Sequence, residues 1–78
     1  RQAVLNKTNG RCGYCGIALD GRWQIDHMHP RCKGGSDAPN NLIASCPACN
    51  TKKSGRTVDE FRAMYEGGVT FYFETLER

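Results

Sequence analysis

The sequence predicts a small α+β fold, in which short helices flank a pair of short strands and a cluster of cysteines supports a small core. Three observations lead to this prediction. The 78 residues make one domain, residues 1–78, and a chain of this length buries only about 60% of its unfolded surface. Four of the five cysteines fall in two Cys-X-X-Cys pairs. Strand-like and helix-like segments follow one another along the chain, without internal repeats.

The first part of the chain predicts a helix and then a strand. The stretch "RQAVLNKTNG" at 1–10 is typical of a short helix that ends at Asn9 and Gly10. Further on, "DGRWQIDH" predicts a turn followed by a strand, with its apolar residues, Trp23 and Ile25, on one face.

The middle of the chain predicts a loop, a second strand and a helix. Prolines and glycines make 30–40 a loop, and "NLIAS" at 41–45 is a short, mostly apolar strand. Pro47 comes directly after Cys46 and suits the first turn of a helix, which Gly55 would end.

The last part of the chain, 57–78, predicts another helix and a strand. Thr57 and Glu60 have the spacing of a capping box, and a pair of glycines at 67–68 would end the helix. Apolar and polar residues alternate at 69–74, which predicts a strand. The residues at helical spacing that we expect to face the core are Val58, Phe61, Met64 and Tyr65.

The paired cysteines predict a zinc site. Cys12 with Cys15, and Cys46 with Cys49, give the spacing of a four-cysteine structural zinc site. A disulfide framework is the alternative, but the sequence shows no signal peptide and Cys32 would have no partner. We therefore expect structural zinc and a reducing, intracellular setting.

Positive charge gathers in the middle of the chain. The net charge is +3, and the acidic residues concentrate between Asp59 and Glu77. No apolar run approaches the roughly 18 residues that a membrane span needs. The basic half is predicted to contact a polyanion, and a solvated face without a partner is the alternative. Its basic residues are Arg31, Lys33, Lys52, Lys53 and Arg56.

Side chains that can bind a metal or transfer a proton are predicted to meet where the two strands and the helix after Cys46 come together. If the strands pair, Asp26 and His27 at the end of the first lie near Asn41 at the start of the second. Asn50 faces the strands from the helix, and Lys53 shares its helix face. Such a pocket suits phosphodiester hydrolysis, because a carboxylate and an amide oxygen can hold Mg²⁺ while a neutral histidine accepts a proton from water.

Three motifs, "DHMHP", "GGSDAPNNL" and "CPACNTKK", resemble the HNH endonucleases, also called His-Me finger or ββα-metal nucleases. The resemblance covers about residues 11–56, and the intervals from Asp26 to Asn41 and Asn50 also resemble those of the HNH domain in CRISPR effector nucleases. It implies a ββα-metal core with two zinc knuckles. It also implies DNA hydrolysis that depends on a divalent metal, Mg²⁺ or Mn²⁺, and leaves 5′-phosphate and 3′-hydroxyl ends.

The resemblance assigns roles to individual residues. His27 would be the general base, with its ring oriented by Asn41, while Asp26 and Asn50 would bind the catalytic metal. His29 is a candidate accessory residue, and an ordinary polar loop residue is the alternative reading. The residues expected to contact DNA phosphates are Arg31, Lys33, Lys52 and Lys53.

Two function classes remain after this step. The first is a cytoplasmic, bacterial or phage-encoded DNA endonuclease, with a homodimer or an additional recognition subunit as possible partners. Its site specificity would come from the short flanks, a missing segment or a partner. The second is a non-catalytic zinc module that binds nucleic acid or protein. An intact set of Asp26, His27 and Asn50 favours the enzyme, since a module that only binds has no physical need for it.

Overall fold

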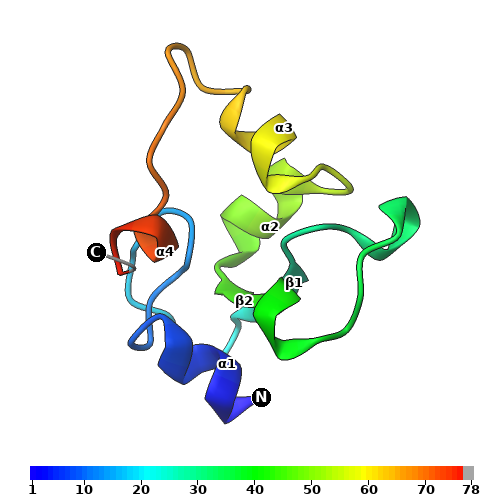
Figure 1. Ribbon diagram of the computed structural model, residues 1–78. Helices are drawn as coiled ribbons and strands as arrows, with labels where there is room; N and C mark the ends of the chain where they lie inside the picture. Colours follow the sequence, from blue (N-terminus) through cyan, green and yellow to red (C-terminus); the bar gives the residue numbers. More distant parts are fainter. Residues whose placement is uncertain (77–78) are drawn as a thin grey trace.

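An antiparallel hairpin stands at the centre of the computed structural model, which describes residues 1–76. Strand β1, Gln24–His27, pairs with β2, Leu42–Ser45, so that Gln24 lies opposite Ser45 and His27 opposite Leu42 (Figure 1). This hairpin is the predicted one, with β2 starting one residue later than expected. Residues 77 and 78 of the predicted domain lie outside the described residues.

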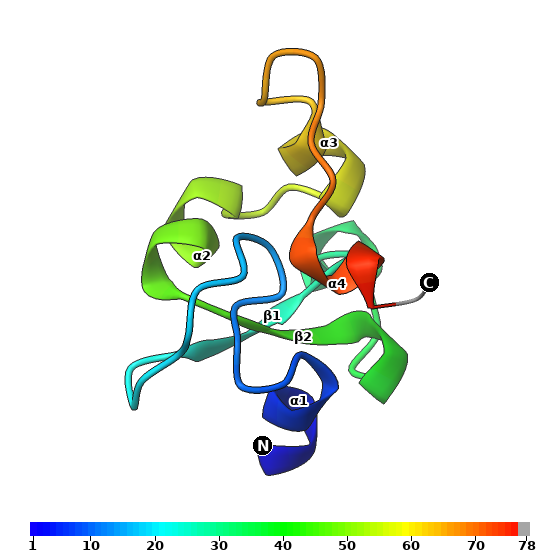
Figure 2. The same cartoon turned by 90° about the vertical axis from the view of Figure 1, so that its left-hand side faces the viewer.

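Helices cover both sides of the hairpin. Figure 2 shows α1 on one side of the strands and the other helices on the opposite side. Helix α1 ends slightly before the predicted Asn9 and Gly10, with Thr8 as its C-cap, and those two residues then take positive φ angles of 55° and 75°. The helices are α1, Gln2–Lys7; α2, Pro47–Lys53; α3, Val58–Arg62; and α4, Tyr72–Thr75.

Two small clusters of buried side chains form the core. On the α1 side, Val4 and Trp23 pack with Ala44. On the other side, Tyr14 lies edge-on to Phe61 and Phe71, with both ring centroids 5.2 Å away. Cysteines Cys12, Cys46 and Cys49 belong to this second cluster, so three of the four predicted zinc ligands are part of the core.

The C-terminal part corrects two predictions. The capping box of Thr57 and Glu60 is present, but α3 ends at Arg62, and Met64 is 43% exposed instead of facing the core. The tail forms α4 in place of the predicted strand. Backbone N–H groups at 72 and 73 bond to the carbonyls of residues 14 and 13, and Glu74 accepts the N–H of Phe71, so the N–H groups that the first turn of a helix leaves unpaired have partners here.

The loop between the strands is tightly folded. It contains two 3₁₀ turns, Arg31–Lys33 and Pro39–Asn41. Gly35 must be a glycine, because a Cβ there would lie 1.7 Å from the carbonyl oxygen of His29. No helix among the described residues has the length and apolar character needed to cross a membrane.

Candidate functional site

The four paired cysteines converge on one point. The Sγ atoms of Cys12, Cys15, Cys46 and Cys49 all lie within 4.8 Å of one another. Those of Cys15 and Cys46 are 3.8 Å apart, and a tetrahedron with Zn–S bonds of ~2.3 Å has edges of about 3.8 Å. The cluster therefore has the shape that a structural zinc ion requires.

Local backbone turns position these cysteines. Gly16, at φ 82°, turns the chain back so that its N–H bonds to the carbonyl of Cys12. Cys46 caps α2, and its sulfur accepts the N–H of Cys49. Both Cys-X-X-Cys segments are thus closed turns whose N–H groups stabilise thiolates.

The thiols carry the electrostatic signature of a cation site. Burial, followed by the charge of Cys12, raises the pKa of Cys49 far above its ordinary value. Burial acts on Cys12 as well, but hydrogen bonds from the backbone of Cys46, Cys15 and Tyr14 outweigh it and lower the pKa to about 7. A cation placed between four such sulfurs would favour their thiolate forms, and Zn²⁺ is a cation that a four-cysteine group of this kind could hold.

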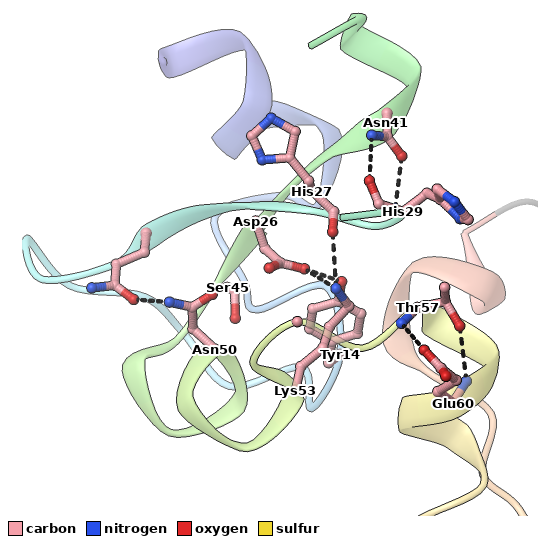
Figure 3. Close-up of polar contacts among 12 residues, drawn as sticks. Tyr14, Asp26, His27, His29, Asn41, Ser45, Asn50, Lys53, Thr57 and Glu60 are labelled. Atoms are coloured by element: carbon pink, nitrogen blue, oxygen red, sulfur yellow. Dashed lines mark hydrogen bonds and ion pairs between the residues drawn. The ribbon is translucent and has the colours of Figure 1, made fainter. Parts of the chain in front are cut away.

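Asp26 lies on the side of the hairpin that faces α2 and is nearly buried (Figure 3). Its Oδ2 accepts the hydroxyl of Tyr14 at 2.5 Å and lies 3.0 Å from Nζ of Lys53. The Tyr14 pKa is raised, first by burial and then by the Asp26 charge, so its hydroxyl remains a donor. Both contacts fall on Oδ2, which leaves Oδ1 as the oxygen that can turn to a metal.

The position of Lys53 corrects the prediction that it contacts DNA phosphate. Its side chain is 0% exposed, and its ammonium group also donates to the carbonyl oxygen of His27 at 2.8 Å. The helical spacing did place Lys53 on the face that meets the strands. However, that face is packed against β1, so the ammonium serves as the buried partner of Asp26.

Asn50 reaches the same side of the hairpin from α2. Its Nδ2 donates to Oε1 of Gln24, which shares a strand face with Asp26. The amide nitrogen is thereby used in holding the side chain, and Oδ1 is the atom with the chemistry of a metal ligand. A carboxylate oxygen from Asp26 and an amide oxygen from Asn50 fit a divalent metal such as Mg²⁺ by donor type.

His27 leaves the opposite side of β1 from Asp26, as the alternation of a strand requires (Figure 3). Its side chain is 26% exposed, and Nε2 lies 2.7 Å from Oδ1 of Asp37. Sequence reasoning missed Asp37. The signal available was its place in the "GGSDAPNN" loop, two residues after Gly35, but nothing in the spacing showed which side chain it would meet.

Among the described residues, the side-chain hydrogen bonds of Asn41 go to the backbone of the loop and not to the His27 ring, so the orientation of that ring by Asn41 stays a prediction. Its Oδ1 accepts the N–H of His29, and its Nδ2 donates to the carbonyl of His29 (Figure 3). Nδ2 also donates to the carbonyl of Ser36. The amide closes the loop because the chain from 29 to 36 must turn back on itself. His29 is exposed, and its Nε2 lies 2.9 Å from the Lys33 carbonyl oxygen.

The remaining basic residues are at the surface. Arg31 is 71% exposed, with Nε 3.8 Å from Asp37. Lys33 pairs with Glu60 of α3, and its bond is the first cause that lowers the Glu60 pKa to about 2. Lys52 lies over the Tyr65 ring, 4.1 Å from its centroid. Their contact with DNA phosphates stays a prediction.

A cavity lies beside the interstrand loop, where side chains of α1 and of the C-terminal segment meet it. It has a volume of about 370 Å³ and includes none of the predicted site residues. The cavity is lined by Lys7, Thr8, Met28, Asn40, Phe73 and Leu76.

Known proteins share the sequence pattern and the fold of this chain. Residues 12–56 match the family described as HNH endonuclease. The fold is similar to the solved Type II-C Cas9 enzyme of Actinomyces naeslundii, with a TM-score of 0.74 and 27% identity over 91% of this chain. The chain spans about 7% of that enzyme's length. No curated protein sequence matches the chain.

Proposed function

Because this chain belongs to the HNH endonuclease family, we propose that it is a metal-dependent endonuclease that hydrolyses DNA phosphodiester bonds. The observation that carries the proposal is the arrangement at the end of β1. Asp26 and Asn50 both lie on one side of the hairpin, and the half-buried His27 imidazole follows Asp26 directly in the strand and leaves its other side.

The roles follow from the chemistry of these groups. A divalent metal held by Asp26 and Asn50 would stabilise charge on the phosphate and on the leaving oxygen. His27 accepts a proton from the attacking water, which a neutral imidazole can do near pH 7. The exposed Arg31 and Lys52 hold backbone phosphates through charge, without reading sequence. The zinc centre keeps α2, and with it Asn50, against the hairpin.

Cleavage of supercoiled plasmid by zinc-loaded protein, with and without Mg²⁺ or Mn²⁺, tests the proposal. His27→Ala should lower the initial nicking rate by about 10²–10⁴-fold, the usual value of a general base, while zinc content and DNA binding stay close to wild type. His29→Ala should lose much less, because that ring bonds to the Lys33 carbonyl. Wild-type protein that binds DNA but never nicks it would favour the non-catalytic zinc module.

The metal ligands should behave differently from the base. Asp26→Asn and Asn50→Ala should raise the metal concentration needed for half-maximal nicking, and excess Mn²⁺ should restore part of the rate. Imidazole in the buffer should help only His27→Ala. If His27→Ala is rescued by metal alone, His27 is a ligand and not the base.

A further inference from the structure

The interstrand loop brings a carboxylate to the candidate base. Oδ1 of Asp37 lies 2.7 Å from Nε2 of His27, which is hydrogen-bonding distance. An ionised carboxylate can only accept, so the proton of this bond belongs to Nε2. In a neutral imidazole with its proton on Nε2, the lone pair is on Nδ1.

Asp37 is ionised for a clear reason. The hydrogen bond from His27 lowers its pKa, and the positive charge of Arg31, 3.8 Å away, lowers it further. Asp37 thus stays an acceptor at every pH at which the protein is expected to work.

The backbone holds Asp37 in this place. The Asn41 amide bonds to the carbonyl of Ser36, the residue directly before Asp37, and to both backbone groups of His29. Gly35 lets the two arms of the loop approach, since a Cβ there would collide with the His29 carbonyl. The loop is therefore fixed on both sides of the contact with His27.

A carboxylate at position 37 would weaken DNA binding if it had no other role. The surrounding exposed residues include Arg31 and Lys33, and a carboxylate among them repels the phosphates that they are proposed to bind. Removing a bystander carboxylate should therefore tighten DNA binding and leave turnover as it was.

We propose that Asp37 is a positioning residue for His27, which fixes the ring with Nδ1 as the atom that takes the proton from water. This inference rests on the proposed function. As Nδ1 takes the proton, the water oxygen bonds to phosphorus, the bond from phosphorus to the leaving oxygen breaks, and that oxygen takes a proton from solvent. Asp37 stabilises the imidazolium that forms. Asn41 acts through the same contact, because it holds the loop that carries Asp37.

The kinetic test compares Asp37→Ala with Asp20→Ala. Asp20 is another exposed aspartate in an ion pair with an arginine, and it lies in the turn before β1, away from His27. Asp37→Ala should lower kcat for plasmid nicking about 10–100-fold, as loss of an orienting partner does at metal sites, with KM for DNA unchanged or lower. Asp37→Glu, which keeps the carboxylate, should recover part of kcat. Asp20→Ala should leave kcat unchanged.

A second test does not need activity. In zinc-loaded protein labelled with ¹⁵N-histidine at about pH 8, the His27 ring should show a protected Nε2–H signal. Asp37→Ala should remove that signal. The His29 ring, whose Nε2 faces the Lys33 carbonyl, should give the same signal in both proteins and serves as the internal control.

The outcomes separate the two proposals. If wild-type protein nicks DNA and Asp37→Ala keeps its kcat, or keeps the His27 Nε2–H signal, the positioning role is overturned and the nuclease stands. If wild-type protein never nicks DNA with any divalent metal, the proposed function falls, and the positioning role falls with it even where the NMR signal shows the contact.

Discussion

Replacing Lys53 by methionine tests the buried ion pair most directly. The Lys53 side chain is 0% exposed and that of Asp26 is 9% exposed, so neither charge can turn to water if its partner is lost. Removing one partner of a buried pair costs about 3–5 kcal/mol, because the other charge is left uncompensated. A domain of 78 residues has a total stability of only about 4–12 kcal/mol.

The assay is thermal unfolding of zinc-loaded protein, followed by circular dichroism. For a domain of this size each kcal/mol shifts Tm by about 4–8 °C, so Lys53→Met should lower Tm by at least about 12 °C. The neighbouring Lys52 is exposed over the Tyr65 ring, and Lys52→Met should cost less than about 1 kcal/mol. The double variant Lys53→Met/Asp26→Asn should be more stable than Lys53→Met alone, because it removes the uncompensated charge.

Equal melting temperatures for Lys53→Met and Lys52→Met would refute this reasoning. Lys53 would then be a surface cation, and the earlier prediction that it contacts phosphate would be restored. A double variant no more stable than the single one would show that Lys53 contributes packing rather than charge.

The other predictions concern zinc, surface charge and acid stability. Cys46→Ser should abolish the zinc content measured by metal analysis and leave the chain largely unfolded, because zinc binding of this kind contributes ~10 kcal/mol or more to folding; a variant that melts like wild type would disprove the four-cysteine site. Arg31→Ala and Lys52→Ala should each lower the slope of log affinity against log salt by about one and weaken binding equally on all DNA sequences, whereas a changed sequence preference would mean that the residue reads bases. The Glu60 pKa is lowered from 4.5 to about 2, so its bond to Lys33 stabilises the fold fully above pH 4.5 and less as the pH falls towards 2. Glu60→Gln should therefore be less stable than wild type at neutral pH and should approach it near pH 2, and a difference that stays constant with pH would contradict the ion pair.

Local signals in the sequence determined the framework of this protein. The cluster of four cysteines followed from two short spacings, the start of α2 from Pro47, and the α3 cap from Thr57 and Glu60. The hairpin strands followed from apolar residues and neighbouring turns. Each of these features depends on residues a few positions apart, which is the range over which sequence patterns act.

Only the tertiary structure decided which side chains of the site contact one another. The spacing placed Lys53 on the correct helix face, but its charge alone suggested a surface role, and burial against Asp26 depends on how closely α2 packs on β1. In the same way, Asn41 was expected to orient the His27 ring, and its amide bonds to the backbone of the loop. Asp37, which carries no motif of its own, forms a hydrogen bond with that ring. The segment after Phe71 forms a helix because the N–H groups of its first residues, 72 and 73, bond to the carbonyls of Tyr14 and Gly13. The physical reason is common to all: these partners are far apart in the chain, and a contact between distant residues is set by packing rather than by any local pattern.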